Sequence, residues 1–342
     1  MMTNSWLNED ITKLNIAEAV SDMAPGSCIL VTGATGLIGS MLCRTLCMVS
    51  ERDELDLKIC ALARNTEKAA KVLADVIEDN NITIANDLSS IDFKVDYIIH
   101  TACPTKSDFF VNNPVETIQT IVGGTQDILE FAKEQNVKSV VYLSSMEVYG
   151  LITEEKKLAP EDIGYVNNLS LRSSYPEGKR LAELLCVSFF NEYNVPVKVV
   201  RLAQTFGPGI PKEDNRVFAQ FIKAAVSGED IVMHTRGRSK RMYIDTIDAV
   251  SAILTVLCKG ENGAVYNAGN EDNYCSIKEM ADMVIKEFGT GENKVVIDQK
   301  LDNGQYPPEN ILLLDVDELR KLGWKPTYNL KDMYQRMLDV EI

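Results

Sequence analysis

Directly after an apolar run at 28–32, the chain reads Gly33-Ala34-Thr35-Gly36-Leu37-Ile38-Gly39. Glycines at these positions permit a tight turn, a close approach of the backbone to a pyrophosphate, and close packing of a helix on a strand. The N-terminus of the helix after the loop attracts the anion. The stretch therefore predicts a dinucleotide site with six cofactor-binding residues: Gly33, Thr35, Gly36, Leu37, Ile38 and Gly39.

Segments around this loop alternate between two hydrophobic patterns. Apolar runs typical of buried strands occur at 28–32, 57–63, 95–100 and 139–144, and helical spacing occurs at 37–49, 66–77 and 115–134. Short apolar strands separated by helices predict an α/β fold, a doubly wound parallel sheet covered on both faces. Farther along, we expect a long helix at 175–192 and a strand at 197–201.

We expect three regions along the chain. Residues 1–25 form an N-terminal extension with one helix across Ile11–Val20. Residues 26–205 form mainly the dinucleotide-binding domain, and residues 206–342 form mainly a smaller C-terminal substrate-binding lobe that is interleaved with it.

Composition excludes several classes of protein. The net charge of -15 opposes binding to nucleic acid or to an anionic membrane surface. No apolar run reaches the roughly 18 residues that span a bilayer, so we expect no membrane segment and a cytoplasmic protein. The eight cysteines include no C-x-x-C pair and the histidines number two, which predicts reduced thiols and no histidine-rich metal site; we expect no metal, although this count leaves a site of oxygen ligands open.

A tyrosine followed four residues later by a lysine occurs twice, at Tyr175 with Lys179 and at Tyr274 with Lys278. Lowering a tyrosine pKa from about 10 to about 7 requires about 4 kcal/mol of preferential stabilisation of the phenolate. Lys179 lies on the same helix face as Tyr175 and supplies a cation. Ser145, which follows the apolar run at 139–144, supplies a hydroxyl donor. We expect Tyr274 to lie in a loop that enters a surface helix.

These motifs together resemble the extended short-chain dehydrogenase/reductase superfamily, the NAD-dependent nucleotide-sugar epimerases and dehydratases. The resemblance runs from about Cys28 to Pro326 and implies a Rossmann-like fold and a homodimer formed through helices of the first lobe. It implies that Tyr175 takes a proton from a sugar hydroxyl while the adjacent carbon gives a hydride to the nicotinamide, and that Lys179 holds the nicotinamide ribose. Further positions that it assigns to the cofactor are Asp87, Leu88, Thr101 and Ala102.

The choice between NAD and NADP depends on the end of the second strand. An acidic residue there would bind both ribose hydroxyls, but the chain has Arg64, which could pair with a 2′-phosphate or stack on the adenine. The redox-neutral chemistry of the resembling enzymes goes with NAD. NAD is therefore favoured, and NADP stays open.

The two residues after Ser145 bear on the fate of the 4-keto sugar that oxidation produces. Many 4,6-dehydratases have Asp-Glu here, whereas this chain has Met146 and Glu147, which leaves Glu147 as the candidate second acid or base. We expect an epimerase or a dehydratase. A UDP-glucuronate decarboxylase is an alternative, because residues 166–180 and 214–217 resemble those enzymes, although residues 302–308 lack their downstream arginine. An NADPH-dependent reductase and a non-catalytic dinucleotide-sensing scaffold stay open as well.

The substrate expected is a nucleotide-diphosphate sugar, which needs cations in an acidic protein. Arg216 and Arg241 match positions of the resembling family that contact the diphosphate or the nucleotide. Gln204 and Ile121 stand where that family often has asparagines. The candidate substrate-binding residues are Ser145, Gln204, Arg216, Val217 and Arg241.

Overall fold

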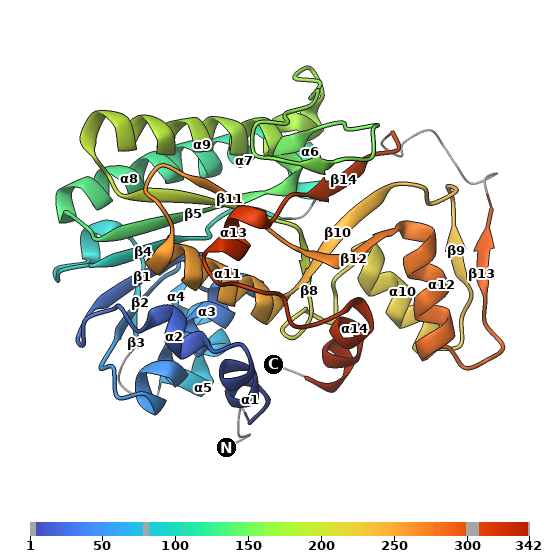
Figure 1. Cartoon of the computed structure of the whole chain (residues 1–342), viewed down its shortest axis with the longest axis horizontal. Coiled ribbons are helices and arrows are strands. Elements are labelled where there is room, and N and C mark those ends of the chain that lie inside the picture. Colours follow the sequence, from blue (N-terminus) through green and yellow to red (C-terminus); the bar gives the residue numbers. More distant parts are fainter. Residues whose placement is uncertain (1–4, 78–81, 106, 299–307, 341–342) are drawn as a thin grey trace.

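A central parallel sheet organises the protein (Figure 1). The computed structural model describes residues 5–77, 82–105, 107–298 and 308–340. In this part of the chain the sheet has seven strands in the order β11-β7-β5-β4-β1-β2-β3, and every neighbouring pair is parallel. The strands are β1 (Cys28–Thr32), β2 (Lys58–Leu62), β3 (Ile82–Ala85), β4 (Tyr97–His100), β5 (Ser139–Ser145), β7 (Val197–Leu202) and β11 (Val265–Ala268). The predicted α/β fold is confirmed.

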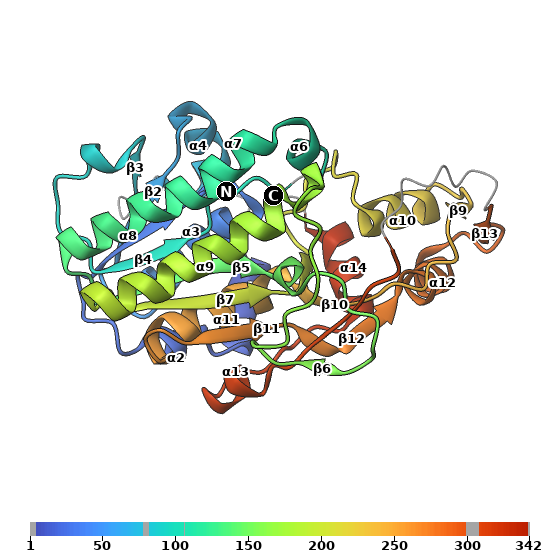
Figure 2. The same cartoon turned by 90° about the horizontal axis from the view of Figure 1, so that it is seen from above.

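Helices cover both faces of this sheet (Figure 2). Alternate residues of one strand belong to different apolar clusters: Leu143 joins the cluster under α3 and α11, and Tyr142 joins the cluster under α8 and α9. This period-2 alternation is what a strand buried on both faces produces. The helices are α3 (Leu37–Arg52), α11 (Thr246–Lys259) and α2 (Ile16–Val20) on the first face, and α6 (Ser107–Asn112), α7 (Pro114–Ile118), α8 (Gly124–Gln135) and α9 (Ser174–Tyr193) on the second.

Three predicted helices are interrupted. The single N-terminal helix expected at 11–20 is wrong, because Asn15 adopts a left-handed conformation with φ 50° and separates α1 (Ser5–Lys13) from α2. The segment 66–77 divides at Leu73 into α4 (Thr66–Val72) and α5 (Ala74–Ile77). The segment 115–134 contains a π-helical turn at Gln119–Gly123, between α7 and α8.

The C-terminal half builds a second, smaller sheet and also returns to the first. The second sheet has the order β12-β10-β14-β6, with β8 paired to β10, and β9 pairs separately with β13. Its neighbours α10 and α12 lie at the far end of the molecule from the central sheet (Figure 1). The elements are β6 (Lys157–Leu158), β8 (Gln204–Phe206), α10 (Val217–Val226), β9 (Ile231–Met233), β10 (Lys240–Asp245), β12 (Asn270–Ser276), α12 (Ile277–Phe288), β13 (Val295–Ile297), β14 (Ile311–Leu314), α13 (Asp317–Lys321) and α14 (Leu330–Asp339).

A buried charge cluster ties the two ends of the chain together. Arg336 of α14 pairs with Asp10 of α1, and the Tyr328 hydroxyl donates a hydrogen bond to the same carboxylate. Asp245 lies 3.4 Å from Arg336, and burial raises the pKa of Asp245 to about 7. Asp248 accepts hydrogen bonds from the backbone of Thr327 and Tyr328. These contacts hold the end of β10 and the start of α11 in place.

Candidate functional site

The glycine loop joins β1 to α3 at the carboxyl end of the sheet. Gly33 has φ 66°, and a Cβ there would lie 2.7 Å from Thr101 Oγ1 and 2.8 Å from Ala102 Cα. A Cβ on Gly39 would overlap the Gly33 carbonyl oxygen. Gly36 is exposed at the N-terminus of α3, whose first backbone N–H groups have no helical acceptor. The residues present therefore fit a pyrophosphate held against a helix N-terminus.

Two further cofactor candidates lie at the carboxyl ends of neighbouring strands. Arg64 is exposed two residues after β2, and Asp87 follows β3, which pairs with β2. Asp87 Oδ1 accepts hydrogen bonds from Ser89 Oγ at 2.6 Å and Ser90 N at 3.0 Å, and the Ser89 bond lowers the Asp87 pKa. Leu88 is half-buried beside it. The fold thus places Arg64, Asp87 and the glycine loop along one edge of the sheet.

The turn after β4 is fixed by hydrogen bonds to β1. Thr101 Oγ1 donates to the Thr32 carbonyl oxygen at 2.6 Å, and the Ala102 N–H donates to Thr32 Oγ1 at 3.1 Å. Thr101 and Ala102 therefore lie against the glycine loop.

His100 continues this network into the π-helical turn. Its Nδ1 lies 2.7 Å from Thr32 Oγ1, and its Nε2 lies 3.2 Å from Thr125 Oγ1, which donates to the Ile121 carbonyl oxygen. Burial, and then the Lys179 charge, lowers the pKa of His100 to about 3, so the ring is neutral. The hydrogen bonds then assign the proton to Nε2. Ile121 itself faces α9, where a Cβ on Gly178 would lie 3.3 Å from Ile121 Cδ1.

Tyr175 lies in the first turn of α9 with 8% of its surface exposed. Its ring stacks on Phe110 with centroids 4.3 Å apart and planes at 13°. Burial raises the pKa of Tyr175 well above its usual value, ionisation of Cys103 and the Glu147 charge add to this, and a hydrogen bond with Ser145 and the charge of Arg172 oppose it. The phenol is therefore protonated until a further cation stabilises its anion.

Lys179 lies one helical turn beyond Tyr175 and is buried at 4% exposure. Its Nζ donates to the Leu143 carbonyl oxygen at 2.6 Å and lies 4.7 Å from the centroid of the Tyr142 ring. The same atom is 6.0 Å from the centroid of the Tyr175 ring. The structure therefore brings Tyr175, Lys179 and Ser145 together at the end of β5.

Glu147 is engaged by a residue that sequence reasoning did not single out. Arg172 Nη2 donates to both oxygens of the Glu147 carboxylate, at 2.9 and 2.8 Å. Phe110, Cys103 and Arg172 all lie around Tyr175, although none was predicted as a site residue. Arg172 lies three residues before Tyr175, in the 3₁₀ turn Leu171–Ser173 that precedes α9, so no helical periodicity marked it. No signal in the sequence marked Phe110.

The candidate substrate residues lie on the second sheet and at the start of α10. Arg216 pairs with Asp214 through Nη2 at 2.7 Å, and its guanidinium carbon lies 4.7 Å from the centroid of the Phe218 ring. Val217 begins α10 and is exposed. Gln204 of β8 is opposite Tyr243 of β10, two residues from Arg241. The fold thus puts Gln204 and Arg241 on adjacent strands.

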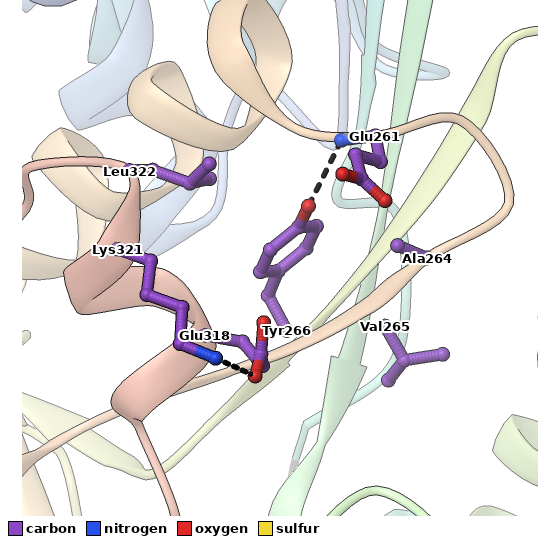
Figure 3. A pocket seen from close by; sticks show the side chains of 7 residues that line it. All are labelled: Glu261, Ala264, Val265, Tyr266, Glu318, Lys321 and Leu322. Carbon is purple, nitrogen blue, oxygen red and sulfur yellow. Dashed lines mark hydrogen bonds and ion pairs between the residues drawn. The ribbon is translucent and has the colours of Figure 1, made fainter.

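Two surface hollows lie away from these residues. One of about 170 Å³ is lined by Glu261, Tyr266 and Leu322 among others (Figure 3). The other, of about 330 Å³, lies beside α10 and β9. Neither is lined by Tyr175 or Lys179. In the part of the chain that the structure describes, no group of three or more His, Cys, Asp or Glu side chains could hold a metal ion, and no helix is long and apolar enough to cross a membrane.

The parallel sheet, the glycine loop at its carboxyl edge and the adjacent tyrosine and lysine define a dinucleotide-dependent enzyme. The chain belongs to the NAD dependent epimerase/dehydratase family, whose model matches residues 29–269. Membership confirms the expected family and the nicotinamide cofactor.

Curated relatives and solved structures resemble the chain over most of its length. UDP-glucuronic acid decarboxylase 6 of Arabidopsis thaliana is 30% identical over 310 residues, covering 89% of this chain and 85% of the relative. UDP-glucuronic acid decarboxylase 1 of Danio rerio is 30% identical, covering 89% and 70%. The dTDP-glucose 4,6-dehydratase of Streptomyces venezuelae, with NAD bound, has a TM-score of 0.75 at 23% identity, covering 91% and 96%. That likeness concerns the fold.

Proposed function

We propose that this enzyme transiently oxidises a hydroxyl of a nucleotide-diphosphate sugar to give a 4-keto intermediate. One observation carries the proposal: Ser145, the buried Tyr175 ring and the Lys179 ammonium lie together at the end of β5, with Lys179 Nζ 6.0 Å from the centroid of the Tyr175 ring. The glycine loop and the Thr101 turn, proposed to hold the cofactor, lie at the same edge of the sheet. The substrate sugar would lie between Ser145 and the second sheet, with its diphosphate near Arg216, Val217 and Arg241.

The proposed role of Tyr175 is to take the proton from the sugar hydroxyl. Bound NAD would accept the hydride and add a positive charge beside the phenol. Lys179 supplies the second cation, which offsets the rise in the Tyr175 pKa that burial causes. Ser145 donates a hydrogen bond to the phenolate or to the sugar oxygen. Proton transfer by one positioned side chain of this kind contributes about 10²–10⁴-fold to a rate.

The fate of the keto sugar defines the subclass, and two outcomes have support. An epimerase or dehydratase follows from the family and from Glu147 as the second acid or base. A decarboxylase is the second candidate, because the curated relatives at 30% identity are UDP-glucuronic acid decarboxylases. The absence of an arginine from residues 302–308 weighs against a decarboxylase. Residues 302–307 of this loop lie outside the described part of the chain.

We propose NAD rather than NADP as the physiological cofactor. The family description names NAD, and Arg64 is exposed with room to stack on an adenine. Binding of both cofactors to wild type and Arg64→Ala, measured by calorimetry, tests this. Tighter binding of NADP, lost in Arg64→Ala, would reverse the assignment.

A homodimer through helices of the first lobe is also proposed. The helices α7 and α9 lie together on one face of the sheet (Figure 2), and both carry exposed apolar residues. Monomeric proteins rarely expose large apolar patches, so a second copy of this chain is the occupant proposed for this face. The exposed aliphatic residues of α7 and α9 are Val115, Ile118, Leu181, Leu184 and Val187. Sedimentation of wild type and Leu184→Glu tests whether this face forms a dimer.

A cytoplasmic location is the third accompanying proposal. All eight cysteines lie in the described part of the chain and none is in a disulfide, which fits a reducing compartment. Fractionation of cells that express the full-length protein tests it.

Mass spectrometry of products from a panel of UDP-, dTDP-, GDP- and CDP-sugars, including a uronate, tests the function directly. Unchanged mass with altered stereochemistry identifies an epimerase, loss of water a dehydratase, and loss of carbon dioxide a decarboxylase. Net gain of two hydrogens identifies a reductase. Turnover that is unchanged in Tyr175→Phe would contradict the mechanism, and cofactor binding without turnover of any sugar would favour a sensing scaffold.

A further inference from the structure

Arg172 stands between two groups of the proposed catalytic centre. It belongs to the 3₁₀ turn Leu171–Ser173 that leads into α9, and its Nη2 donates to both oxygens of Glu147 at 2.9 and 2.8 Å. Its guanidinium carbon lies 5.2 Å from the centroid of the Phe110 ring. Phe110 in turn stacks on Tyr175 at 4.3 Å. One guanidinium therefore contacts both the carboxylate and the aromatic ring that flank the tyrosine.

These contacts have opposite electrostatic effects on Tyr175. The Glu147 charge raises the Tyr175 pKa, and the Arg172 charge lowers it. A carboxylate beside a phenol that must ionise opposes catalysis unless a cation neutralises it. The side chains of Arg172 and Glu147 are 39% and 27% exposed, so solvent screens the pair only in part.

We propose that Arg172 is a positioning residue that neutralises Glu147 beside Tyr175 and holds Phe110 against the phenol ring. The proposal rests on the proposed function, in which Tyr175 is the acid and base. It explains how a second carboxylate can lie in the site without suppressing ionisation of the tyrosine. It also gives a role to the arginine that lies three residues before Tyr175.

Among the described residues, the charged or titratable groups that face Tyr175 come from several elements. Cys103 comes from the turn after β4, Glu147 follows β5, Arg172 precedes α9, and Lys179 lies within α9. Tyr142 faces the same space from β5. Of these groups, Glu147 is the one that Arg172 pairs with, so loss of Arg172 alone should unmask the Glu147 charge. Loss of both should remove the unmasked charge together with its partner.

A double-mutant cycle with Arg172→Gln and Glu147→Gln measures this coupling on the full chain with NAD bound. Fluorotyrosine, whose phenol is more acidic, brings the titration into reach, and Tyr175→Phe identifies the Tyr175 signal among those of the twelve tyrosines by fluorine NMR. Arg172→Gln should raise the Tyr175 pKa by about 0.5 to 1 unit. The double variant should return to within about 0.3 unit of wild type, and Arg172→Lys should shift less than Arg172→Gln.

The same variants have a kinetic signature. With a sugar that the wild type accepts, Arg172→Gln should move the rising limb of the kcat profile to higher pH, lowering kcat about 3- to 10-fold near neutral pH with little change in KM. Equal Tyr175 pKa values in Arg172→Gln and wild type would overturn the proposal. So would a rise in KM alone, which would make Arg172 a substrate contact.

Failure of the proposed function gives a different result. If no nucleotide sugar is turned over, the kinetic test has no substrate, but the fluorine titration still measures whether Arg172 and Glu147 act on Tyr175 in opposite directions. Thermal unfolding of each variant shows whether it is folded, and Arg172→Lys provides the folded comparison if Arg172→Gln unfolds.

Discussion

Tyr175 and Lys179 share a spacing with Tyr274 and Lys278, and the fold places the two pairs in different surroundings. The first pair lies on α9 and is buried, with 8% and 4% of the surface exposed. In the second pair, Tyr274 lies in β12, and Lys278 lies in α12 and pairs with Asp282. The expected loop at Tyr274 is therefore wrong. A four-residue spacing brings two side chains together only where both residues belong to one helix.

The largest expected effect comes from removing the Tyr175 hydroxyl, with removal of the Tyr274 hydroxyl as the comparison. Tyr175→Phe should lower kcat by about 10²–10⁴-fold, because the proton acceptor is lost. Tyr274→Phe should change kcat by less than about twofold, since Tyr274 lies in β12 of the second sheet, whereas Ser145 and the glycine loop belong to the central sheet. Steady-state assays with the sugar found by mass spectrometry give both values. A large loss in Tyr274→Phe would mean that burial on α9 does not distinguish the pairs.

The cofactor loop offers the next test, because it is what the second pair lacks. Gly39→Ala should weaken NAD binding at least about tenfold, since the added Cβ would overlap the Gly33 carbonyl oxygen and displace the loop. Gly124→Ala is the matched control, because nothing lies within 4 Å of a Cβ built there in α8. It should bind NAD as wild type does. Calorimetric titration with NAD compares them, and equal affinities would contradict the proposed loop.

Both tyrosines should lower the free energy of unfolding at alkaline pH to a similar extent. Burial raises the pKa of both Tyr175 and Tyr274. An unfolded tyrosine ionises near pH 10 while the folded one keeps its proton, so the free energy of unfolding falls as pH rises above about 10. Each Phe variant should reduce the loss between pH 9 and pH 11 by about 1 kcal/mol. Urea unfolding at both pH values measures it.

A similar result for both variants would show that a raised pKa does not mark the catalytic tyrosine. A reduction in Tyr175→Phe alone would instead make the pKa a property of the site. In the first case, the comparison would rest on Lys179, Ser145 and the glycine loop rather than on burial of the phenol.

Local patterns in the sequence predicted the sheet and the loop well. The run 28–32 and the glycines after it lie within a few residues of each other, so their spacing alone indicates strand, turn and helix. The break at Asn15 escaped prediction, because a left-handed asparagine leaves no trace in the hydrophobic pattern. The π-helical turn at Gln119–Gly123 escaped for a similar reason.

The surroundings of Tyr175 were predictable only in part. Lys179 follows on the same helix, and Ser145 was placed by resemblance. Phe110 lies sixty-five positions earlier and reaches Tyr175 only through the fold, as does the pairing of Arg172 with Glu147. Contacts between distant segments depend on how helices pack on the sheet, and one sequence does not fix that packing.

The smallest expected effect is on the free energy of unfolding, which replacement of Lys278 and replacement of Lys179 should change differently. Lys278 forms an exposed pair with Asp282 one turn away, so Lys278→Met should lower the free energy of unfolding by about 0.3–0.5 kcal/mol. Lys179 is buried, and among the described residues no carboxylate lies within ion-pair distance of it. A buried ammonium bonded to the Leu143 carbonyl oxygen costs desolvation, and the proposed catalytic role accounts for that cost. Lys179→Met should therefore leave stability unchanged or raise it while turnover falls, as urea unfolding and kcat together would show. A stability loss above about 1 kcal/mol would instead make Lys179 a structural residue.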